Sequence, residues 1–575
     1  MNGTVQRDRP EAQVRVGGEP LAPLVAADVV ELDVHEEVGR HGRLTLLVQN
    51  WDPDRRAVRH SDDGPFVPGS DIAVFLGYHE ELTSVFDGVI VSLTAHFPRG
   101  GQPVLRVEGR SRSVLLDHPA RSRQLADVTD ADVAAAVAAD YSLGTDAAEG
   151  VTHPFFVTDR ISDWEALTRR AAELGWIVLV RGTTLVMRPP SAAQEPIELA
   201  WTRDLVELHL TQDLTRAIDT AVGVAWDLDE LEAEASEESA EAAGLDTGGR
   251  PRHDDALGDA GWPLREERVE SAATTAPAEA DARALGAQRT ATLGHVHGTG
   301  VVQGDPGLRC DGWVSIAGAG RRLSGPHYLT AARHRFSAQG YRTEIQLGFP
   351  PRILPPVPAA RADRTLAFGV VEALDDPLAL NRVKVRLPWR SDGGDGVWAR
   401  LSCVDAGEGS GAVIVPDVGQ EVLVGAVDGD PSQLVVLGSL HNGVQQPPVA
   451  VDPATNAVRT LVSPEGHTLR LEDGENSAVT LVSGAGHSLV ISDQDSEVVL
   501  THRDSGNAIR LSADGIEFSA AQGDIVLSSP SGTVALDALK LEATTSGPSK
   551  IESSATFELK ASGSLSLRGS LITIN

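Results

Sequence analysis

The sequence predicts a mainly β protein that ends in a repeat array. Nearly the same hexapeptide occurs three times at twenty-residue intervals, at Gly466–Leu471, Gly486–Ile491 and Gly506–Leu511. Residues 20–110 alternate apolar and polar side chains in short runs that Gly and Pro interrupt, which is typical of β-strands. Both patterns have a period of two residues, so strands rather than helices dominate the prediction.

Composition limits the functional classes. A chain of 575 residues with 41% hydrophobic residues is large enough for several domains. The formal charge of −33 argues against nucleic-acid binding. Cys310 and Cys403 leave no disulfide framework and are expected as buried thiols. The first residues lack an apolar signal region and no run of 18 apolar residues occurs, so we expect assembly in the cytoplasm and no signal peptide or membrane helix.

Residues 1–125 are predicted as a first β-barrel-like domain and residues 126–226 as a segment of helices and strands. One helix is expected over 127–140. A second begins after Ser162, which is its predicted N-cap, with Glu165 as the capping-box partner and Gly175 at its end. Strands should follow at Trp176–Val180 and Thr184–Met187.

Residues 227–277 are predicted as an acidic, mobile insertion. Twelve acidic residues lie between 227 and 259 against only Arg250 and Arg252. Such a composition usually remains solvated, so we expect this region to be the most sensitive to proteases. A specific acidic docking site is the alternative interpretation.

A short Ala-rich helix near 278–290 and strands to about 348 should complete a second barrel-like domain over 278–349. Residues 350–363 are Pro-rich and predict a stiff linker. Residues 364–446 predict a compact β block, and residues 455–575 predict a needle.

Pairs of apolar residues separated by one residue continue through the needle region. Each pair places two apolar side chains on one face of a very short strand, which cannot bury that face alone. A regular array of such strands must therefore stack or intertwine to enclose a narrow apolar core. The predicted core residues are Leu469, Leu471, Leu489, Ile491, Ile509, Leu511, Ile525, Leu527, Leu565 and Leu567.

Catalytic motifs are not recognisable in the sequence, so we expect no enzyme, no cofactor and no metal. His295 and His297 would share one face of a strand, but no third ligand is apparent nearby. His467 and His487 recur at one repeat position, where a trimer could form rings of three imidazoles. Asn507 stands at that position in the third repeat, which favours a role in a turn or at the surface.

Two stretches carry a family resemblance. Gly369–Val371, Asn381–Trp389, Val415–Val424 and Val436–Gly443 resemble the OB-fold domain in the central spike of contractile injection machines. That family includes phage baseplate spikes, VgrG proteins of type VI secretion and spikes of extracellular injection systems. Ser162–Pro190 and Gly304–Gly348 resemble the phage late-control D hub.

The resemblance implies a hub of two related β-barrel-like domains, an OB-fold and a C-terminal trimeric intertwined β-prism. A homotrimer with six similar hub surfaces would seat a six-fold inner tube of Hcp-like hexamers within the baseplate. A PAAR-type tip protein would cap Leu571, Ile572, Ile574 and Asn575. The implied function is a structural hub and spike that punctures a target membrane and contacts it only transiently.

Three system types stay open: an extracellular phage-tail-like particle, which the hub and the lack of an effector extension favour, a phage tail baseplate, and a type VI VgrG. A sugar-binding or single-strand-binding OB-type protein or an enzyme is a remote alternative.

Overall fold

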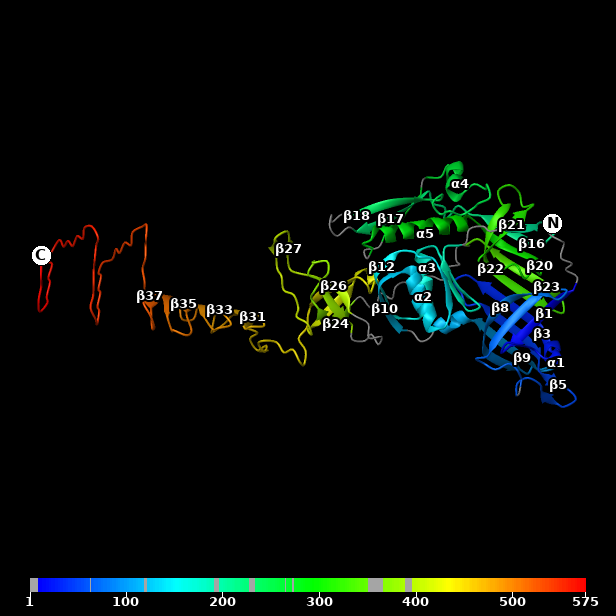
Figure 1. Ribbon diagram of the computed structural model, residues 1–575, viewed down its shortest axis with the longest axis horizontal. Coiled ribbons are helices and arrows are strands. Elements are labelled where there is room, and N and C mark those ends of the chain that lie inside the picture. The colour runs from blue at the N-terminus through cyan, green and yellow to red at the C-terminus, as the bar shows by residue number, and fades with distance from the viewer. Residues whose placement is uncertain are drawn as a thin grey trace. The chain divides into compact units, whose positions relative to one another are not determined.

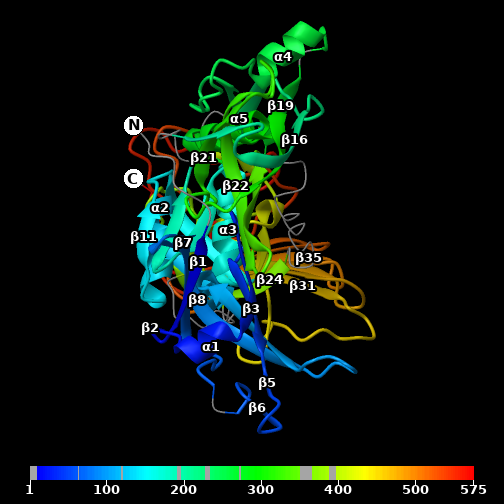
Figure 2. The same ribbon diagram turned by 90° about the vertical axis from the view of Figure 1, so that its right-hand side faces the viewer.

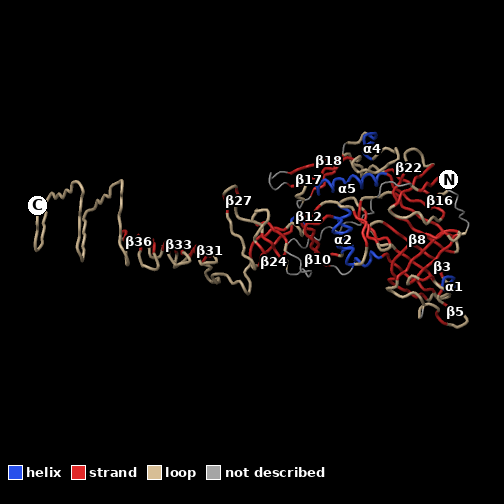
Figure 3. The backbone as a smooth tube through the Cα atoms, in the orientation of Figure 1, coloured by secondary structure: helices blue, strands red, loops and turns tan. Residues whose placement is uncertain are grey.

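The computed structural model describes residues 9–62, 64–117, 121–190, 196–226, 233–263, 265–270, 274–349, 366–387 and 396–574. The chain divides into two compact units, Met1–Gln445 and Gln446–Asn575, and each is described by itself. Strands predominate in both (Figure 1), so the predicted fold class is confirmed; Figure 3 shows the few helices in blue. None of the helices in these ranges combines the length and apolar character that a membrane span requires.

A 13-stranded sheet forms the largest part of the first unit. Its main path is β16-β20-β23-β22-β3-β4-β9-β8-β7-β1-β2, with β15 and β21 attached through β22. The strands are β1 Pro10–Val16, β2 Glu19–Pro20, β3 Val29–Glu37, β4 Arg43–Gln49, β7 Asp71–Tyr78, β8 Glu81–His96, β9 Val104–Ser111, β15 Ile197–Ala200, β16 Leu205–Gln212, β20 Val296–Gln303, β21 Gly312–Ala317, β22 Gly325–Ser337 and β23 Gly340–Leu347.

The two predicted hub segments meet within this one sheet. β3 and β22 pair antiparallel, with Val34 opposite His334. Strands from residues 1–125 and from residues 278–349 are therefore hydrogen-bonded neighbours. The helix α1 (Pro23–Ala27) and the short hairpin of β5 (Trp51–Asp52) and β6 (Ala57–Val58) lie between strands of the first segment.

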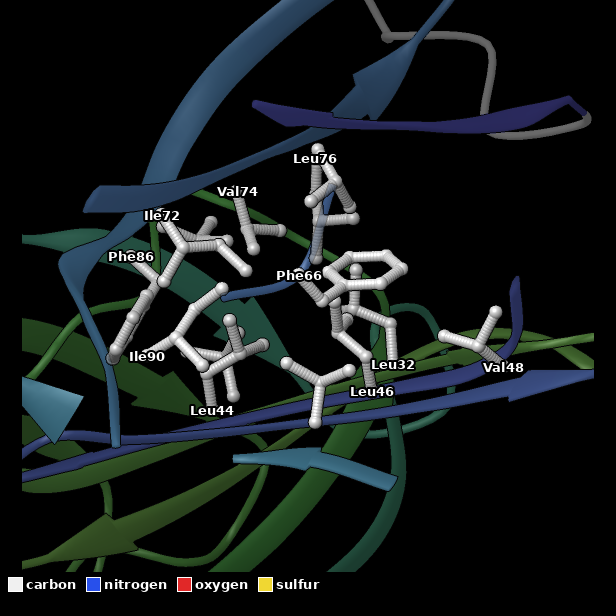
Figure 4. Packing of buried hydrophobic residues seen from close by; sticks show 14 of the residues in the cluster. Leu32, Leu44, Leu46, Val48, Phe66, Ile72, Val74, Leu76, Phe86 and Ile90 are labelled. Carbon is white, nitrogen blue, oxygen red and sulfur yellow. The ribbon is translucent and has the colours of Figure 1, made fainter. Parts of the chain in front are cut away.

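The hub core follows from the alternation along its strands. Leu44, Leu46 and Val48 on β4 are fully buried, and the residues between them are less buried. Figure 4 shows Leu44 near Ile90 and Leu46 near Leu32 and Phe66, with Val48 at the far end of the cluster. The apolar cluster around them closes the space between the two parts of the curved sheet.

Helices and short strands form a second core in the first unit. They are the 3₁₀ helix η1 (Arg112–Asp117), β10 (Arg121–Thr129), α2 (Asp130–Asp140), β11 (Gly144–Ala147), β12 (Thr152–Ile161), α3 (Asp163–Glu173), β13 (Ile177–Arg181) and β14 (Thr184–Arg188). Ser162 caps α3 as predicted, because its Oγ accepts the Glu165 N–H at 3.1 Å. The Glu165 carboxylate pairs with Arg169, in contrast to the predicted capping box.

The prediction of a mobile insertion is wrong for the described part of residues 227–277. β18 (Ala233–Ser239) and β19 (Glu266–Glu270) flank β17 (Thr220–Trp226), and α4 (His253–Ala260) packs against α5 (Pro277–His295), as Figure 2 shows. His253 is fully buried and its Nε2 lies 3.0 Å from Gln288 of α5. Residues 227–232, 264 and 271–273 lie outside the described ranges.

Two physical features explain why this acidic segment folds. Three of its carboxylates, Glu234, Glu237 and Glu238, lie on the edge strand β18, where they are exposed or half-buried and can stay hydrated. Its packing needs small rather than large apolar residues: a Cβ on Gly223 would lie 2.3 Å from the Ala280 carbonyl oxygen, so α5 approaches β17 very closely. Composition alone cannot reveal that fit.

A closed five-stranded barrel follows in the same unit, as predicted for residues 364–446. Its strands, in the order β24-β25-β26-β30-β29, are β24 Leu366–Ala373, β25 Val383–Arg386, β26 Val397–Leu401, β29 Glu421–Ala426 and β30 Leu434–Ser439. A small hairpin of β27 (Ala406–Gly407) and β28 (Ser410–Gly411) and the 3₁₀ turn η3 (Val427–Gly429) lie between them. Cys403 is exposed, contrary to expectation, whereas Cys310 is buried. The predicted linker at 350–363 lies outside the described residues.

The second unit contains a seven-stranded antiparallel meander in which each strand pairs with the next. The strands are β31 Val458–Val462, β32 Thr468–Glu472, β33 Ala478–Val482, β34 Ser488–Ser492, β35 Glu497–Thr501, β36 Ala508–Ser512 and β37 Gly515–Ser519. Between Ala520 and Ile574 the described chain carries no strand within itself. The apolar pairs of that region therefore lack neighbours from their own chain.

Candidate functional site: an apolar face on the repeat sheet

The register of the meander gathers its apolar residues into two columns on one face. Leu481 of β33 lies opposite Leu469 and Leu489, and Val479 lies opposite Leu471 and Ile491. The first column contains Leu461, Leu469, Leu481, Leu489, Leu500, Ile509 and Phe518, and the second contains Leu471, Val479, Ile491, Val498, Leu511 and Ile516. Six of the ten predicted core residues belong to these columns.

This apolar face is open in a single chain. Leu481 is 46% exposed and Leu500 is 50% exposed, although both lie in the middle of the sheet. The central column of the other face is mixed and contains Thr460, Arg470, Thr480, Val490, Val499, Arg510 and Glu517. A contiguous apolar surface of this kind on a soluble strand array marks an interaction surface.

The remaining predicted core and tip residues lie beyond the meander. Ile525, Leu527, Leu565 and Leu567 are 57%, 73%, 55% and 59% exposed. At the end of the described chain, Leu571 and Ile574 are 83% and 84% exposed and Ile572 is 50% exposed. Asn575 lies outside the described residues. The single chain does not bring these side chains together.

In each hexapeptide repeat, one side chain accepts a hydrogen bond from a backbone N–H in the next turn along the same edge of the sheet. His467 Nδ1 accepts the Gly484 N–H at 3.1 Å, and His487 Nδ1 accepts the Arg503 N–H at 3.2 Å. Asn507 Oδ1 accepts the Gln522 N–H at 3.0 Å. The glycine before each of them has a φ between 68° and 89°, which L-side chains rarely adopt. The sequence interpretation of these positions as turn residues agrees with this geometry.

His467→Asn is expected to leave the meander intact, whereas His467→Ala should destabilise it. Asparagine supplies the same acceptor, as Asn507 does, while alanine leaves the Gly484 N–H without its partner. The expected cost of the alanine variant is about 0.5–1.5 kcal/mol. Thermal unfolding of the purified full chain measures the difference, and equal destabilisation by both variants would contradict this role.

His295 and His297 do not share a face, which corrects the sequence expectation. His295 is the last residue of α5 and donates through Nδ1 to the Asp213 carbonyl oxygen at 3.1 Å. His297 lies in β20 and donates to the Gly294 carbonyl oxygen at 2.8 Å. Both rings satisfy backbone groups, so this pair offers no metal site.

A Ser-His-Asp chain in the hub was not anticipated from the sequence. His41 Nδ1 lies 2.8 Å from Ser113 Oγ, and His41 Nε2 lies 2.7 Å from Asp117 Oδ2. Ser113 is fully buried behind the imidazole and also bonds to Ser111. A nucleophilic serine must reach its substrate, so this arrangement fastens η1 to the sheet and does not support covalent catalysis.

The chain thus combines a closed five-stranded barrel with a strand array whose apolar face is open. The chain belongs to the Alg8 N-terminal domain family, whose model matches residues 6–338. The type VI secretion system/phage-baseplate injector OB domain matches residues 367–441, which cover the closed barrel. The phage baseplate V C-terminal trimerisation domain matches residues 478–540, which begin at β33.

Curated relatives are spike proteins that match over short segments. The type VI secretion system spike protein VgrG4b of Pseudomonas aeruginosa is 35% identical over 101 residues, 16% of this chain and 12% of that protein. VgrG2a of the same organism is 32% identical over 130 residues, 20% of this chain and 15% of that protein. The matched segments thus span less than a sixth of the length of these relatives.

Solved structures show the same fold over most of the chain. A chain of the lidded Francisella PdpA-VgrG complex has a TM-score of 0.54 at 8% identity, covering 90% of this chain and 81% of its own length. A chain of the lidless complex has a TM-score of 0.53 at 8% identity, covering 89% and 98%. The chain therefore resembles VgrG spikes in its barrel domain, its trimerisation-domain match and its fold.

Proposed function

We propose that this protein is the structural hub and spike of a contractile injection system and works as a homotrimer. The observation that carries the proposal is the open apolar face of the meander, which the trimerisation-domain match overlaps. Three such faces turned toward one axis would bury the two columns and remove open strand edges. The ten predicted core residues then form the inside of the needle.

The hub would attach the spike to the inner tube and the baseplate of the injection system. We propose an inner-tube hexamer of the Hcp type and baseplate proteins as its partners, because three hub sheets present repeated surfaces to a six-fold ring. A PAAR-type tip protein is proposed at Leu571, Ile572 and Ile574, whose exposed apolar side chains need a cover. The proposed role is mechanical rather than enzymatic.

An extracellular phage-tail-like particle, assembled in the cytoplasm and then released, is the proposed setting. The late-control D resemblance of the hub supports it, and a phage baseplate or a type VI system is the alternative. Genes for a sheath, a tube and an AAA+ ATPase without capsid genes beside this one would distinguish the extracellular system.

The proposal is tested by the mass and binding of the purified full chain. Light scattering should give three chains of 60.6 kDa each in one particle. A tube protein encoded nearby should be retained by the immobilised trimer through the hub. A stable, folded monomer would refute the spike. A trimer that binds none of the tube proteins encoded nearby would refute the proposed attachment of the hub to the inner tube.

A further inference from the structure

The third turn of the repeat array departs from the first two. The turns at 463–467 and 483–487 have five residues, whereas the turn at 502–507 has six. His502 occupies the place of Ser463 and Ser483, as its N–H bonds to the Asn507 carbonyl oxygen while theirs bond to the corresponding His467 and His487 oxygens. Asp504 lies within this longer turn.

This exchange stacks two imidazoles and brings a carboxylate to them. The rings of His487 and His502 lie 4.3 Å apart at an interplanar angle of 16°. One ligand atom from each of His487, His502 and Asp504 lies within 4.8 Å of the other two. His487 is half-buried and the other two residues are exposed, so a dissolved ion can reach all three.

We propose that His487, His502 and Asp504 form a site for a divalent transition metal of the zinc class. Two imidazoles and one carboxylate, with water in the fourth position, are a ligand set that zinc, nickel and copper accept. Magnesium and calcium prefer several oxygen ligands and would find a single carboxylate here. Metal–ligand distances of about 2.0–2.2 Å require the three side chains to close in slightly by rotation.

The protons at the two rings determine how the site binds metal. In this site the Nε2 atoms would be the ligands, because both Nδ1 atoms face the turns. His502 Nδ1 lies 2.9 Å from Ser505 Oγ and accepts the Ser505 N–H at 3.3 Å, and His487 Nδ1 accepts the Arg503 N–H at 3.2 Å. Binding through Nε2 leaves the single ring proton on Nδ1. His502 Nδ1 then donates to Ser505 Oγ, which orients the ring, and gives up the bond from the Ser505 N–H, while His487 gives up the bond from the Arg503 N–H.

Metal binding therefore replaces the hydrogen bond between the Arg503 N–H and His487 Nδ1 with a metal ion that bridges the same two turns. The bound metal would join residues 487 and 502 at one edge of the meander, and each chain would hold one such site. Binding requires neutral imidazoles.

The other repeats of the chain supply the variants for a test. His487→Asn removes a ligand and keeps the turn bond, as Asn507 does one repeat later. His502→Ser restores the residue of the two earlier turns. His467→Asn is the matched control, because His467 has the same turn role but faces Ser483 rather than a second histidine.

Isothermal titration of the chelator-treated full-length protein with zinc chloride at pH 7.5 measures binding. One zinc per chain is expected for the wild type and for His467→Asn, with affinity at least tenfold lower in His487→Asn and His502→Ser. Unchanged mass and circular dichroism confirm that the variants remain folded. Absence of zinc binding by the wild type, equal loss in His467→Asn, or retained binding in His487→Asn would overturn the site. The zinc titration tests the metal site separately from the proposed function, because the trimeric spike is tested by light scattering.

Discussion

Leu481→Asp is expected to convert the trimer into single chains. Leu481 lies at the centre of the first apolar column, between Leu469 and Leu489. In a trimer the substitution places three carboxylates around one apolar axis, where desolvation and like charges both oppose burial. In a single chain the position is 46% exposed, so the aspartate is tolerated there.

The control for this variant is the neighbouring residue. Thr480 points to the opposite, mixed face, so Thr480→Asp adds the same charge one residue away without entering the proposed core. Light scattering should report single chains for Leu481→Asp and trimers for Thr480→Asp. Trimers in both variants would show that the apolar columns do not form the trimer interface.

Arg170→Ala is expected to destabilise the first unit by about 3–5 kcal/mol. Arg170 of α3 is 6% exposed and joins two other elements: its Nε donates to Asp130 at 2.7 Å and its Nη1 donates to Glu279 of α5 at 2.6 Å. Asp130 is fully buried at the start of α2. The alanine variant leaves the buried Asp130 carboxylate without this cation and removes one of the two arginine partners of the half-buried Glu279, which explains the size of the expected loss.

The same network predicts how stability depends on pH. Burial alone would raise the pKa of Asp130, but hydrogen bonds from His153 and Arg170 outweigh it and lower the pKa to about 2. A carboxyl group whose pKa is lowered on folding stabilises the fold above its unfolded value of about 3.9. That contribution is lost as the pH falls through about 2, and it should be much smaller in Arg170→Ala.

Arg169→Ala is the matched control on the same helix. Arg169 pairs with Glu165 at the surface, and such pairs contribute about 0–1 kcal/mol. Urea unfolding of both variants between pH 2 and 7 gives the comparison. Similar losses in the two variants, or an unchanged acid dependence in Arg170→Ala, would contradict the role of the buried network.

Much of the fold was predictable because short-range patterns determine it. The Ser162 cap and the period-two columns of Leu469, Leu481 and Leu489 follow from local sequence, and the structure has both. The closed barrel was identified through its resemblance to a family. These features need no knowledge of distant contacts.

Other features depend on contacts between residues that are distant in the sequence, and local patterns do not reveal these contacts. The acidic strand β18 folds because α5, some forty residues later, fits closely over Gly223 through small side chains. His502 lies over His487 because a histidine occupies the turn position that Ser463 and Ser483 hold in the two earlier repeats. The repeat is visible in the sequence. That its irregular third turn brings His502 onto His487 is evident only once the register of the strands is known.

The pairing of β3 with β22 has a consequence for folding during synthesis. Asp33 and Arg333, which form an ion pair across these strands, are 300 residues apart in the chain. During synthesis at about 5–20 residues per second, the edge of β3 waits for roughly 15–60 seconds before its neighbour leaves the ribosome. An unpaired strand edge invites association with other chains. Nascent hubs should therefore rely on chaperones, whereas the meander, in which each strand meets the one just made, can form as it emerges.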